Sequence, residues 1–533
     1  MYDVVVVGGG HNGLVAAAYL AKAGLRVCLC EAREVVGGAA VSEHPFGPEF
    51  TVTSLSYVVS LLPPALVRDL ELVRHGYHVY PQGPYFAPRA DGRCLRLPPD
   101  PVARCEQIAK FSDKDAQAYP GWDSWMAGLA RILGPLLDQI PPKIGSRRPA
   151  DVLRQAGLLR RLGGSVDVRS AVDVTRVLTS SIADLVEDHF ESDALRGVLS
   201  VSGVIGTWAG PRSAGTAYVM LHHHVGDLGD GQVGAWGFPR GGMGGVTRAL
   251  AAAARSFGAE IRTAGPVARI DVRDGRAIGV TLESGAELRA GTVITTAHPQ
   301  ISFLRLLDRR DLPAEFVAEI ERWKTRSGTV KINLAVDRLP EFAAKPGFDP
   351  QVHGGTIVLA DSLDDIEGAF QDAVAGRAAG LPFADICIPS VFDDSLAPAG
   401  KHIVSMFSEW VPHQWRAEPH RAELAAYADR LIARMETVAP GFTASILHRQ
   451  IIGPYDMERE YGLVGGNIFH GELTPGQLFH ARPAAGFADL RTPIRGLYQA
   501  GSATHGGGGV TGIPGRNVVR QVLADRRRAR FRR

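Results

Sequence analysis

Short apolar runs and helical stretches of small residues alternate at the start of the chain. Residues 3–7 (DVVVV) are apolar after the first position, a pattern typical of a strand buried on both faces of a parallel sheet. Glycines 8–10 interrupt this run. The apolar spacing then predicts a helix over residues 14–23, which Gly24 ends, and residues 26–30 predict a second buried strand. Together these segments predict one βαβ unit.

The same regular pattern returns twice later in the chain. From about residue 240 a glycine-rich stretch precedes a predicted helix over 246–257, and a strand, a glycine-rich loop and a helix follow one another over 496–524. Within the middle block, which extends to about residue 298, Asp274-Gly275 and Ser284-Gly285 separate short alternating runs, which indicates a β-meander. The strands expected in the middle block are residues 260–263, 267–272, 277–282, 287–289 and 293–296.

Two long and less regular regions separate these blocks. They carry proline-rich connectors, several helical stretches and one alternating strand over residues 330–336. We therefore expect an α/β protein with two discontinuous domains. The regular domain is expected to combine residues 1–65, 240–299 and 485–533, and the second, an inserted α+β domain, residues 66–239 and 300–484.

The composition is that of a folded protein. Of the 533 residues, 45% are hydrophobic and 21% are charged, which excludes a disordered chain. The formal net charge is only +2, and six of the last eight residues are arginine, so the rest of the chain is mildly acidic. This balance excludes nucleic-acid binding as the main activity. We interpret residues 526–533 as a solvated terminus, with peripheral contact to an anionic membrane as the alternative.

The sequence also predicts the compartment. No stretch is long and apolar enough to predict a membrane span, and no signal peptide precedes the first strand. The five cysteines form no CxxC pair and no disulfide framework, and Cys28 and Cys30 fit a buried strand. These features predict a cytoplasmic protein in a reducing compartment. If the terminal arginines bind lipid, the inner face of the membrane is the expected place of contact.

A dinucleotide-binding fingerprint lies between the first two predicted strands. Gly8, Gly10 and Gly13 have the GxGxxG spacing, follow a buried strand and open a helix, and Glu31 ends the next strand. The first glycine permits the tight turn, the second lets backbone amides approach a pyrophosphate, and the third lets helix and strand pack closely. Glu31 is expected to accept hydrogen bonds from an adenosine ribose. The alternative is a glycine-rich turn beside a surface glutamate.

Three segments together resemble flavoproteins of the amine oxidase and phytoene desaturase superfamily. A second glycine pair follows the ribose acid, residues 258–297 resemble the second FAD segment, and residues 501–512 resemble the C-terminal flavin segment. The resemblance implies FAD as the cofactor and a Rossmann-type FAD-binding domain with a β-meander, plus an inserted α+β substrate domain. It adds these residues to the expected cofactor site: Gly37, Gly38, Val267, Gly501, Ser502, Gly509, Val510, Thr511 and Gly512.

Further motifs narrow the resemblance to a phytoene-dehydrogenase-like branch. They lie at residues 221–224, 234–238, 241–244 and 465–471. Two positions depart from carotenoid desaturases: Ala39 replaces the arginine often found after the glycine pair, and Ser502 stands where many flavoproteins have aspartate. These departures bear on the carotenoid substrate more than on FAD binding.

The resemblance implies an FAD-dependent oxidoreductase. The expected reaction moves a hydride between the flavin and a C–C unit of a small lipophilic, isoprenoid-like substrate, by dehydrogenation, saturation or isomerisation. An amine or amino-acid oxidase and a flavin-binding scaffold with little turnover are the alternatives, since related folds host many chemistries. The electron acceptor (oxygen, a quinone or a protein) and the oligomeric state stay open.

Lys331, His470 and His505 are the catalytic candidates. Lys331 lies on strand 330–336, and the resemblance implies that a lysine there holds a water near the flavin; the alternative is a solvated lysine on a half-exposed strand. His470 and His505 can transfer protons near neutral pH, and His505 lies in the flavin segment; the alternative for each is a hydrogen-bonded loop histidine. Histidines 222–224 would diverge on a helix or a strand, so no metal site is expected.

Overall fold

The parallel sheet predicted from the first block has five strands in the computed structural model, which describes residues 1–143, 146, 149–165 and 167–531. Every neighbouring pair in this sheet is parallel. The strands come from three distant parts of the chain. Their order across the sheet is β19 (Leu497–Gln499), β13 (Val293–Thr295), β1 (Val4–Val7), β2 (Val27–Cys30) and β9 (Glu260–Arg262).

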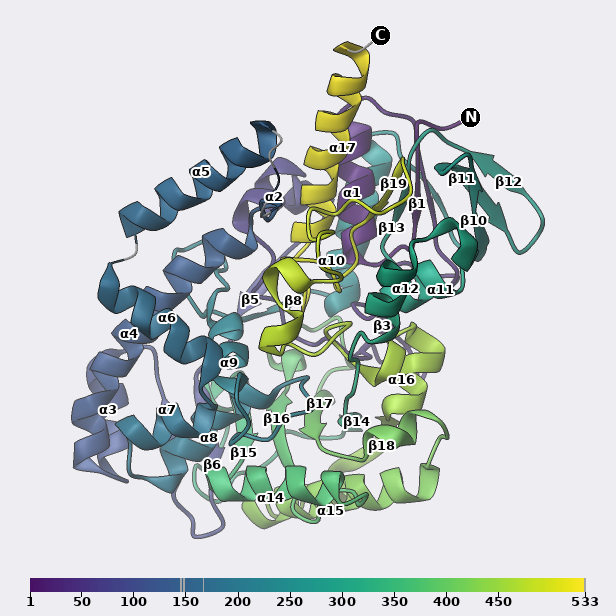
Figure 1. Cartoon of the computed structure of the whole chain (residues 1–533). Helices are drawn as coiled ribbons and strands as arrows, with labels where there is room; N and C mark the ends of the chain where they lie inside the picture. The colour runs from purple at the N-terminus through teal and green to yellow at the C-terminus, as the bar shows by residue number, and fades with distance from the viewer. Residues whose placement is uncertain (144–145, 147–148, 166, 532–533) are drawn as a thin grey trace.

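Both faces of this sheet are covered, which explains why β1 is apolar at every position. One face packs against α1 (His11–Lys22), α10 (Met243–Ser256) and α17 (Ile513–Phe531), which run side by side (Figure 1). α17 continues beyond the predicted end at residue 524, because the next residues are mostly arginine, a good helix former, and include no glycine or proline.

The opposite face packs against the meander and two short helices, α11 (Pro299–Leu304) and α12 (Ala314–Glu321). The predicted β-meander is confirmed as an antiparallel sheet, and its first turn places Asp274 and Gly275 at positive φ. That geometry matches the right-handed twist of the flanking strands. The three meander strands are β10 (Val267–Arg273), β11 (Arg276–Leu282) and β12 (Glu287–Arg289).

A second, larger sheet is built from the two irregular regions. Its pairs are antiparallel except for β6 with β15. The order across it is β18 (Ile446–Ile452), β14 (Thr329–Val336), β17 (His402–Glu409), β16 (Phe383–Cys387), β15 (Thr356–Leu359), β6 (Tyr85–Pro88) and β7 (Cys94–Leu97). Two short pairs complete the strands: β3 (Ser42–Glu43) with β4 (Val52–Thr53), and β5 (Val79–Pro81) with β8 (Gly237–Pro239).

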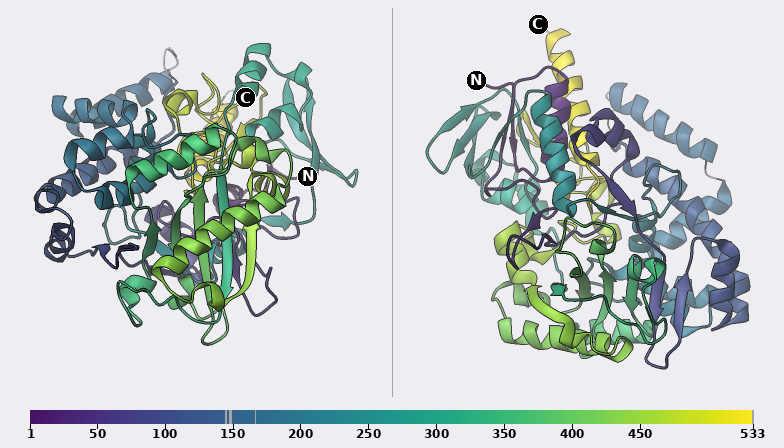
Figure 2. Two further views of the ribbon diagram at one scale, coloured as in Figure 1. Left: turned by 90° about the horizontal axis from the view of Figure 1, so that it is seen from below. Right: turned by 180° about the vertical axis from the view of Figure 1, so that it is seen from behind.

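Helices α14 (Leu363–Val374) and α15 (Arg421–Val438) cover the outer face of the large sheet, and its inner face points toward the five-stranded sheet (Figures 1 and 2). A helical layer lies beside both sheets. The remaining helices are α2 (Pro64–Asp69), α3 (Pro101–Ala109), α4 (Asp113–Leu137), α5 (Pro149–Ser165), α6 (Val168–Thr179), α7 (Ile182–His189), α8 (Asp193–Val204), α9 (Thr216–His224), α13 (Pro350–His353) and α16 (Pro454–Tyr461).

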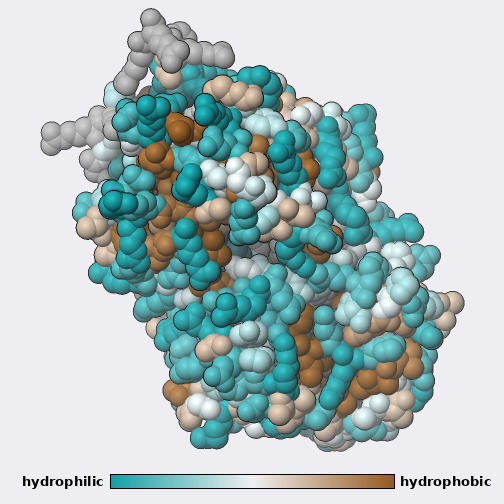
Figure 3. Space-filling model, turned by 90° about the vertical axis from the view of Figure 1, so that its right-hand side faces the viewer, coloured by the Kyte–Doolittle hydropathy of each residue, from teal (hydrophilic) through white to brown (hydrophobic). Residues whose placement is uncertain are grey.

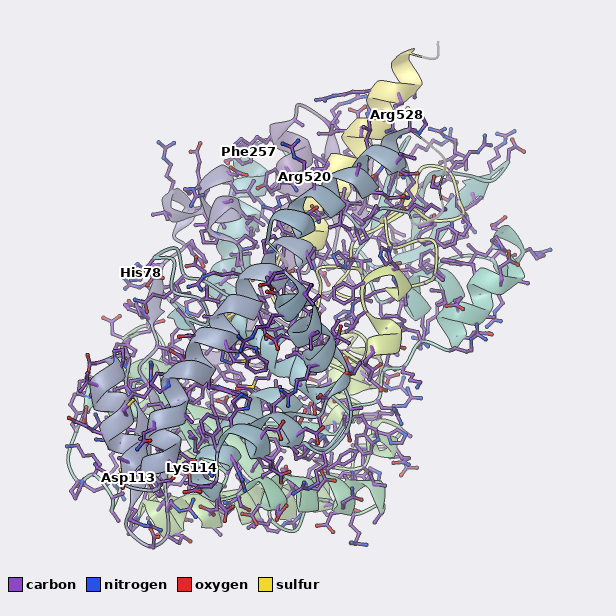
Figure 4. The ribbon with its side chains drawn as sticks, turned by 60° about the vertical axis from the view of Figure 1, so that its left-hand side comes forward. His78, Asp113, Lys114, Phe257, Arg520 and Arg528 are labelled. Atoms are coloured by element: carbon purple, nitrogen blue, oxygen red, sulfur yellow. The ribbon has the colours of Figure 1, made fainter. Side chains whose placement is uncertain are left out.

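The arginine-rich helix α17 lies at one end of the molecule. Arg520 and Arg528 lie along it, at the end opposite Asp113 and Lys114 at the start of α4 (Figure 4). Hydrophilic residues cover most of the face seen in Figure 3, with separate hydrophobic patches among them. No helix in the described part of the chain is long and apolar enough to cross a membrane. Residues 532–533 of the arginine-rich end lie outside the described residues.

Glu409, the last residue of β17, is a buried acid. Thr329 and the Gly206 amide both donate to one oxygen of Glu409, at 2.7 and 2.9 Å, and the other oxygen is buried with no hydrogen-bond partner among the described residues. Burial therefore raises the pKa of Glu409 well above 4.5. The folded protein keeps a proton on Glu409 that the unfolded chain loses.

We predict that Glu409→Gln removes part of the pH dependence of stability. Above about pH 4.5 unfolding releases the Glu409 proton, so wild-type stability falls as the pH rises, by at most ~1.4 kcal/mol per pH unit until the folded pKa is reached. The glutamine keeps an acceptor for Thr329 and Gly206 and carries no proton to release. Urea unfolding from pH 5 to 8 measures the difference, with the exposed Glu315→Gln as control; parallel wild-type and Glu409→Gln curves would contradict the assignment.

Candidate cofactor and active site

One cavity connects the fingerprint loop with the inner face of the large sheet. Its volume is about 620 Å³, and it is lined both by the turn after β1 and by residues of β14, β16 and β17. The part at the fingerprint is called the cradle, and the part at the large sheet the chamber. The chamber is lined by Tyr57, Gln82, Tyr85, Ser202, His223, His224, Trp236, Thr329, Lys331, Thr356, Asp385 and Phe407.

A close contact between β1 and α1 shapes the cradle. A Cβ atom on Gly13 would lie 2.0 Å from the Gly8 carbonyl oxygen, so only glycine permits this approach. The predicted packing role of Gly13 follows from this contact. The first turn of α1 then presents its free backbone amides and positive dipole end to the cavity, where an anionic group is stabilised.

The second glycine pair joins the same loop. The Gly37 amide donates to the Gly9 carbonyl at 2.9 Å, and Gly37 has a φ of +131°, which side-chain-bearing residues rarely adopt. Gly37 and Gly38 line the cavity beside Gly10. The resemblance that placed this pair near the dinucleotide therefore corresponds to a physical contact between the two loops.

Glu31 is held in a fixed orientation at the cradle. Its carboxylate accepts hydrogen bonds from the Gly9 amide at 2.7 Å and the Arg33 amide at 2.9 Å, and the residue is 8% exposed and lines the cavity. Two backbone donors fix the side chain in one rotamer and leave further lone pairs for a ligand. The alternative of a surface glutamate is therefore wrong.

Most of the predicted cofactor residues line the cavity, and four do not. The lining residues are Gly8, Gly10, Glu31, Gly37, Gly38, Val267, Ser502, Gly509 and Val510. Gly13, Gly501, Thr511 and Gly512 are absent from the cavity wall and support it from behind. A Cβ on Gly501 would lie 2.7 Å from the Thr296 carbonyl, and Thr511 donates to the Gly506 carbonyl at 2.8 Å. Gly13 thus has the packing role expected from the sequence, and contact of Gly501, Thr511 and Gly512 with the cofactor stays a prediction.

The cavity wall holds polar atoms that need a ligand. Six of its buried nitrogen and oxygen atoms have no hydrogen-bond partner among the described residues: His11 Nε2, Asn12 Oδ1, Arg33 Nη1, Ser60 Oγ, His298 Nε2 and His470 Nδ1. Leaving such atoms unpaired costs about 1–3 kcal/mol each. A dinucleotide with a pyrophosphate, hydroxyls and ring heteroatoms offers partners along this wall, so the residues present fit FAD.

Three histidines on the wall stay neutral at neutral pH. Burial lowers the pKa of His11 to about 3, that of His470 to about 4 and that of His298 well below 6.5. When His470 is protonated, its charge lowers the pKa values of His11 and His298 further. The His298 and His470 rings lie 5.9 Å apart. The sequence analysis missed His11 and His298, although one lies inside the fingerprint and the other just after a strand of the parallel sheet, where ligands bind.

The structure places the two histidine candidates differently. His470 lines the cavity, which keeps it a candidate for contact with cofactor or substrate. His505 is absent from the cavity wall, and its Nε2 hydrogen-bonds the Leu136 carbonyl at 3.0 Å, at the end of α4. We correct His505 to a hydrogen-bonded loop histidine, the alternative considered from the sequence.

Lys331 is buried in the chamber. It is 1% exposed, and its Nζ donates to Asn333 Oδ1 at 2.9 Å and to Ser405 Oγ, while lying 4.9 Å from the centroid of the Tyr57 ring. Burial lowers the pKa of Lys331 to about 7. The alternative of a solvated lysine is wrong, because α14 and α15 cover one face of β14 and the cavity wall forms the other.

Asp385 is a second buried titratable group in the chamber. Unlike Lys331, it was missed by the sequence analysis. Burial raises the pKa of Asp385 to about 7, against the lowering effects of the nearby Tyr57 hydroxyl and of Lys331. Strand β16 is otherwise apolar or small (FADIC), so the lone acid was the signal available in the sequence. Asp385 and Lys331 both line the chamber.

The three successive histidines lie on α9 and diverge. His222 bonds the Gly508 carbonyl at 2.7 Å, while His223 and His224 bond carbonyls one turn earlier on their own helix. His223 and His224 line the chamber. Within the described ranges, no group of three or more histidine, cysteine, aspartate or glutamate side chains could hold a metal ion.

Arg482 is a buried cation behind the wall. It is 2% exposed and donates to the carbonyls of Phe469 at 2.8 Å and Ser502 at 3.0 Å, both of which line the cavity. Burial lowers the pKa of Arg482 to about 10, so it stays charged at neutral pH. No carboxylate of the described chain makes an ion pair with Arg482, so its charge favours an anionic ligand in the cradle.

Comparison with known proteins agrees with this geometry. Residues 6–65 match the NAD(P)-binding Rossmann-like domain, and residues 167–515 match the family described as flavin containing amine oxidoreductase. The chain belongs to this flavin-containing family. Pyridine nucleotide-disulfide oxidoreductase domain-containing protein 2 of Rattus norvegicus is 40% identical, over 98% of this chain and 94% of that protein.

Two further proteins are similar to this chain. Hydroxyneurosporene desaturase of Rhodobacter capsulatus is 26% identical over 98% of both chains. The solved structure of cyclohexylamine oxidase from Brevibacterium oxydans matches with a TM-score of 0.57 at 17% identity, over 98% of this chain and 99% of that one. These findings confirm the predicted Rossmann-type fold class, the phytoene-dehydrogenase-like resemblance, FAD as cofactor and an FAD-dependent oxidoreductase.

We predict that Glu31→Arg weakens FAD binding at least about ten-fold, because it removes the oriented carboxylate and places a cation against the Gly9 amide. Equilibrium titration of apoprotein with FAD, followed by flavin fluorescence, measures the affinity. Glu34→Arg is the matched control, since Glu34 is exposed on the same loop and adds the same charge. Equal affinities for wild type and Glu31→Arg would refute the ribose contact.

Proposed function

We propose that this protein binds FAD along the cradle and exchanges a hydride with a C–C unit of a lipophilic, isoprenoid-like substrate held in the chamber. The observation that carries the proposal is the single cavity that joins both parts, because substrate and flavin have to meet without bulk water between them. The desaturase among the relatives supports an isoprenoid-like substrate.

The cradle residues account for cofactor binding. The amides at the start of α1 and the Arg482 charge favour the pyrophosphate, Glu31 accepts from ribose hydroxyls, and the backbone at Val267 lies at the adenine end. FAD, when bound, supplies a ring that accepts or returns a hydride. The protein's remaining task is to orient a C–H bond and exclude water, and a general base is not required for that.

Lys331 is the group proposed to handle protons or water in the chamber. Its Nζ is held by Asn333 and Ser405, so the nitrogen is fixed relative to β14 and β17. With a pKa near 7 the amine carries a lone pair for part of the population at neutral pH. This allows it to hold a water molecule or to exchange a proton at Nζ.

An amine oxidase is the second candidate, and the ring pair of Tyr57 and Phe407 favours it. The centroids of these rings lie 6.3 Å apart in the chamber, and aromatic rings can surround an amine. The position of Lys331 argues against an amine oxidase. Its Nζ already lies over the Tyr57 ring and, when protonated, repels a second cation there. A flavin-binding scaffold is the remaining alternative.

Anaerobic photometry of the FAD-loaded protein tests the proposed function. We expect bleaching of the yellow flavin by an isoprenoid donor, or reoxidation of the photoreduced flavin by an unsaturated isoprenoid acceptor. Release of hydrogen peroxide from amines in air would replace the proposal with an amine oxidase. Flavin that no donor reduces and no acceptor reoxidises would leave the scaffold.

We predict that Lys331→Met slows substrate-linked flavin reduction or reoxidation about ten-fold or more, while the FAD content stays that of wild type. If the neutral amine is the working form, the wild-type rate rises with pH through about 7 and the Lys331→Met rate does not. Stopped-flow absorbance at the flavin band measures both. Lys401→Met removes an exposed lysine as control; identical rates and pH profiles for Lys331→Met and wild type would assign Lys331 a structural role only.

A further inference from the structure

One row of side chains crosses the chamber on the inner face of the large sheet. Lys331 on β14 is paired with Phe407 on β17, and Phe407 is paired with Asp385 on β16. Directly paired residues point to the same face, so these three side chains share the wall that lines the cavity. The backbones of β14 and β16 lie two strand spacings apart, about 10 Å.

Tyr57 lies next to this row of three side chains. Its ring lies 4.9 Å from Lys331 Nζ and 6.3 Å from the Phe407 ring, and its hydroxyl lies near enough to Asp385 to lower the pKa of that carboxyl. Asp385 is 7% exposed and lines the chamber, so part of this residue faces the cavity.

The polar character continues beyond Asp385. Gln82 donates to Thr356 on β15 and to Cys387 Sγ on β16, the strand that also carries Asp385. Gln82 and Thr356 both line the chamber. Tyr85 and Ser202 lie on the same wall. This end of the cavity is a hydrogen-bonding surface, and none of it belongs to the dinucleotide cradle.

A hydrocarbon fits this surface poorly. It would displace water from the Asp385 carboxyl and the neighbouring amide and hydroxyl groups and offer no hydrogen bond in return. A site built to pair with a substrate hydroxyl rejects an analogue that lacks it far more strongly than an apolar pocket rejects one methylene. The chamber therefore favours a substrate with a polar group at this end.

The charges of the chamber favour a neutral polar group. Lys331 and Asp385 balance each other whether both are ionised or both neutral. His223 and His224, the histidines of the chamber wall within the described residues, have lowered pKa values and stay neutral. An added ammonium or carboxylate would be compensated only if Lys331 or Asp385 changed its protonation state, whereas a neutral hydroxyl requires no such change.

We propose that the substrate of this protein is an oxygenated lipophile whose neutral hydroxyl group docks on Asp385, while its C–C unit reacts at the other end of the chamber. This rests on the proposed function and names the polar end of that substrate. The hydroxyl donates to the free side of the Asp385 carboxyl. The Tyr57 hydroxyl lies beside this carboxyl and offers the substrate hydroxyl a second partner, and no covalent step takes place at Asp385.

The test compares four probes of one carbon skeleton on the FAD-loaded protein: geraniol, geranyl methyl ether, 2,6-dimethylocta-2,6-diene and geranylamine. Binding is measured from the perturbation of the flavin absorbance and from thermal stabilisation. We expect geraniol to bind at least about ten-fold more tightly than the ether, the hydrocarbon and the amine. Equal or tighter binding of the hydrocarbon, tighter binding of the amine, or no binding of geraniol overturns the proposal.

Variants locate the effect. Asp385→Leu is expected to weaken geraniol binding about ten-fold or more while hydrocarbon binding stays within two-fold or improves, and Tyr57→Phe is expected to reduce the preference for geraniol in part. Tyr427→Phe is the matched control, since Tyr427 bonds Ser408 at 2.6 Å on the side of the sheet covered by α15. An unchanged preference in Asp385→Leu contradicts the assignment. If that variant does not fold, the probe comparison in the wild type still decides.

The two levels of the hypothesis fail separately. Tight binding of geraniol with a flavin that no isoprenoid reduces or reoxidises supports the docking site and refutes the proposed function. Reduction or reoxidation of the flavin by the hydrocarbon, with no preference for geraniol in binding, supports the proposed function and refutes the docking site.

Discussion

The close approach between the first turn of α1 and the end of β1 determines how the cradle is built. With no side chain on Gly13, the helix approaches the Gly8 carbonyl, and Thr296 donates to that same carbonyl at 3.0 Å from the end of β13. The loop after β2 is tied to the turn through Gly37 and Gly9. Three distant parts of the chain thus meet at one point, and amides and a helix dipole converge there.

Burial does most of the chemical tuning. The wall of the cavity carries amine, carboxyl and imidazole groups, and burial shifts the pKa of each so that the neutral form is favoured. It lowers the pKa of Lys331 to about 7 and those of His11 and His470 to about 3 and 4, and it raises the pKa of Asp385 to about 7. Arg482 stays charged behind the wall. The cavity therefore has a buried positive charge behind its wall and an adjustable pair of titratable groups in the chamber.

Most of the cradle was predictable from the sequence, whereas of the chamber row only Lys331 was predicted, for a physical reason. The βαβ unit, the fingerprint and Glu31 depend on local spacing within about thirty residues, and the meander on two turn dipeptides. The chamber depends on pairing between strands far apart in the chain, which brings Lys331 opposite Phe407 and Phe407 opposite Asp385. The alternation over 330–336 is the same for a half-exposed strand and for one that faces an internal cavity.

The same argument explains why similarity alone does not select the substrate. The cradle is built from backbone amides, glycines and one acid, and one such fold can host many chemistries. Discrimination has to come from groups that contact only the substrate. In this chain Lys331, Phe407 and Asp385 form one row across three strands of the chamber, and a neutral polar group leaves the charge balance between Lys331 and Asp385 unchanged. In the proposed function, selectivity is therefore set by the strands of the large sheet and not by the nucleotide fingerprint.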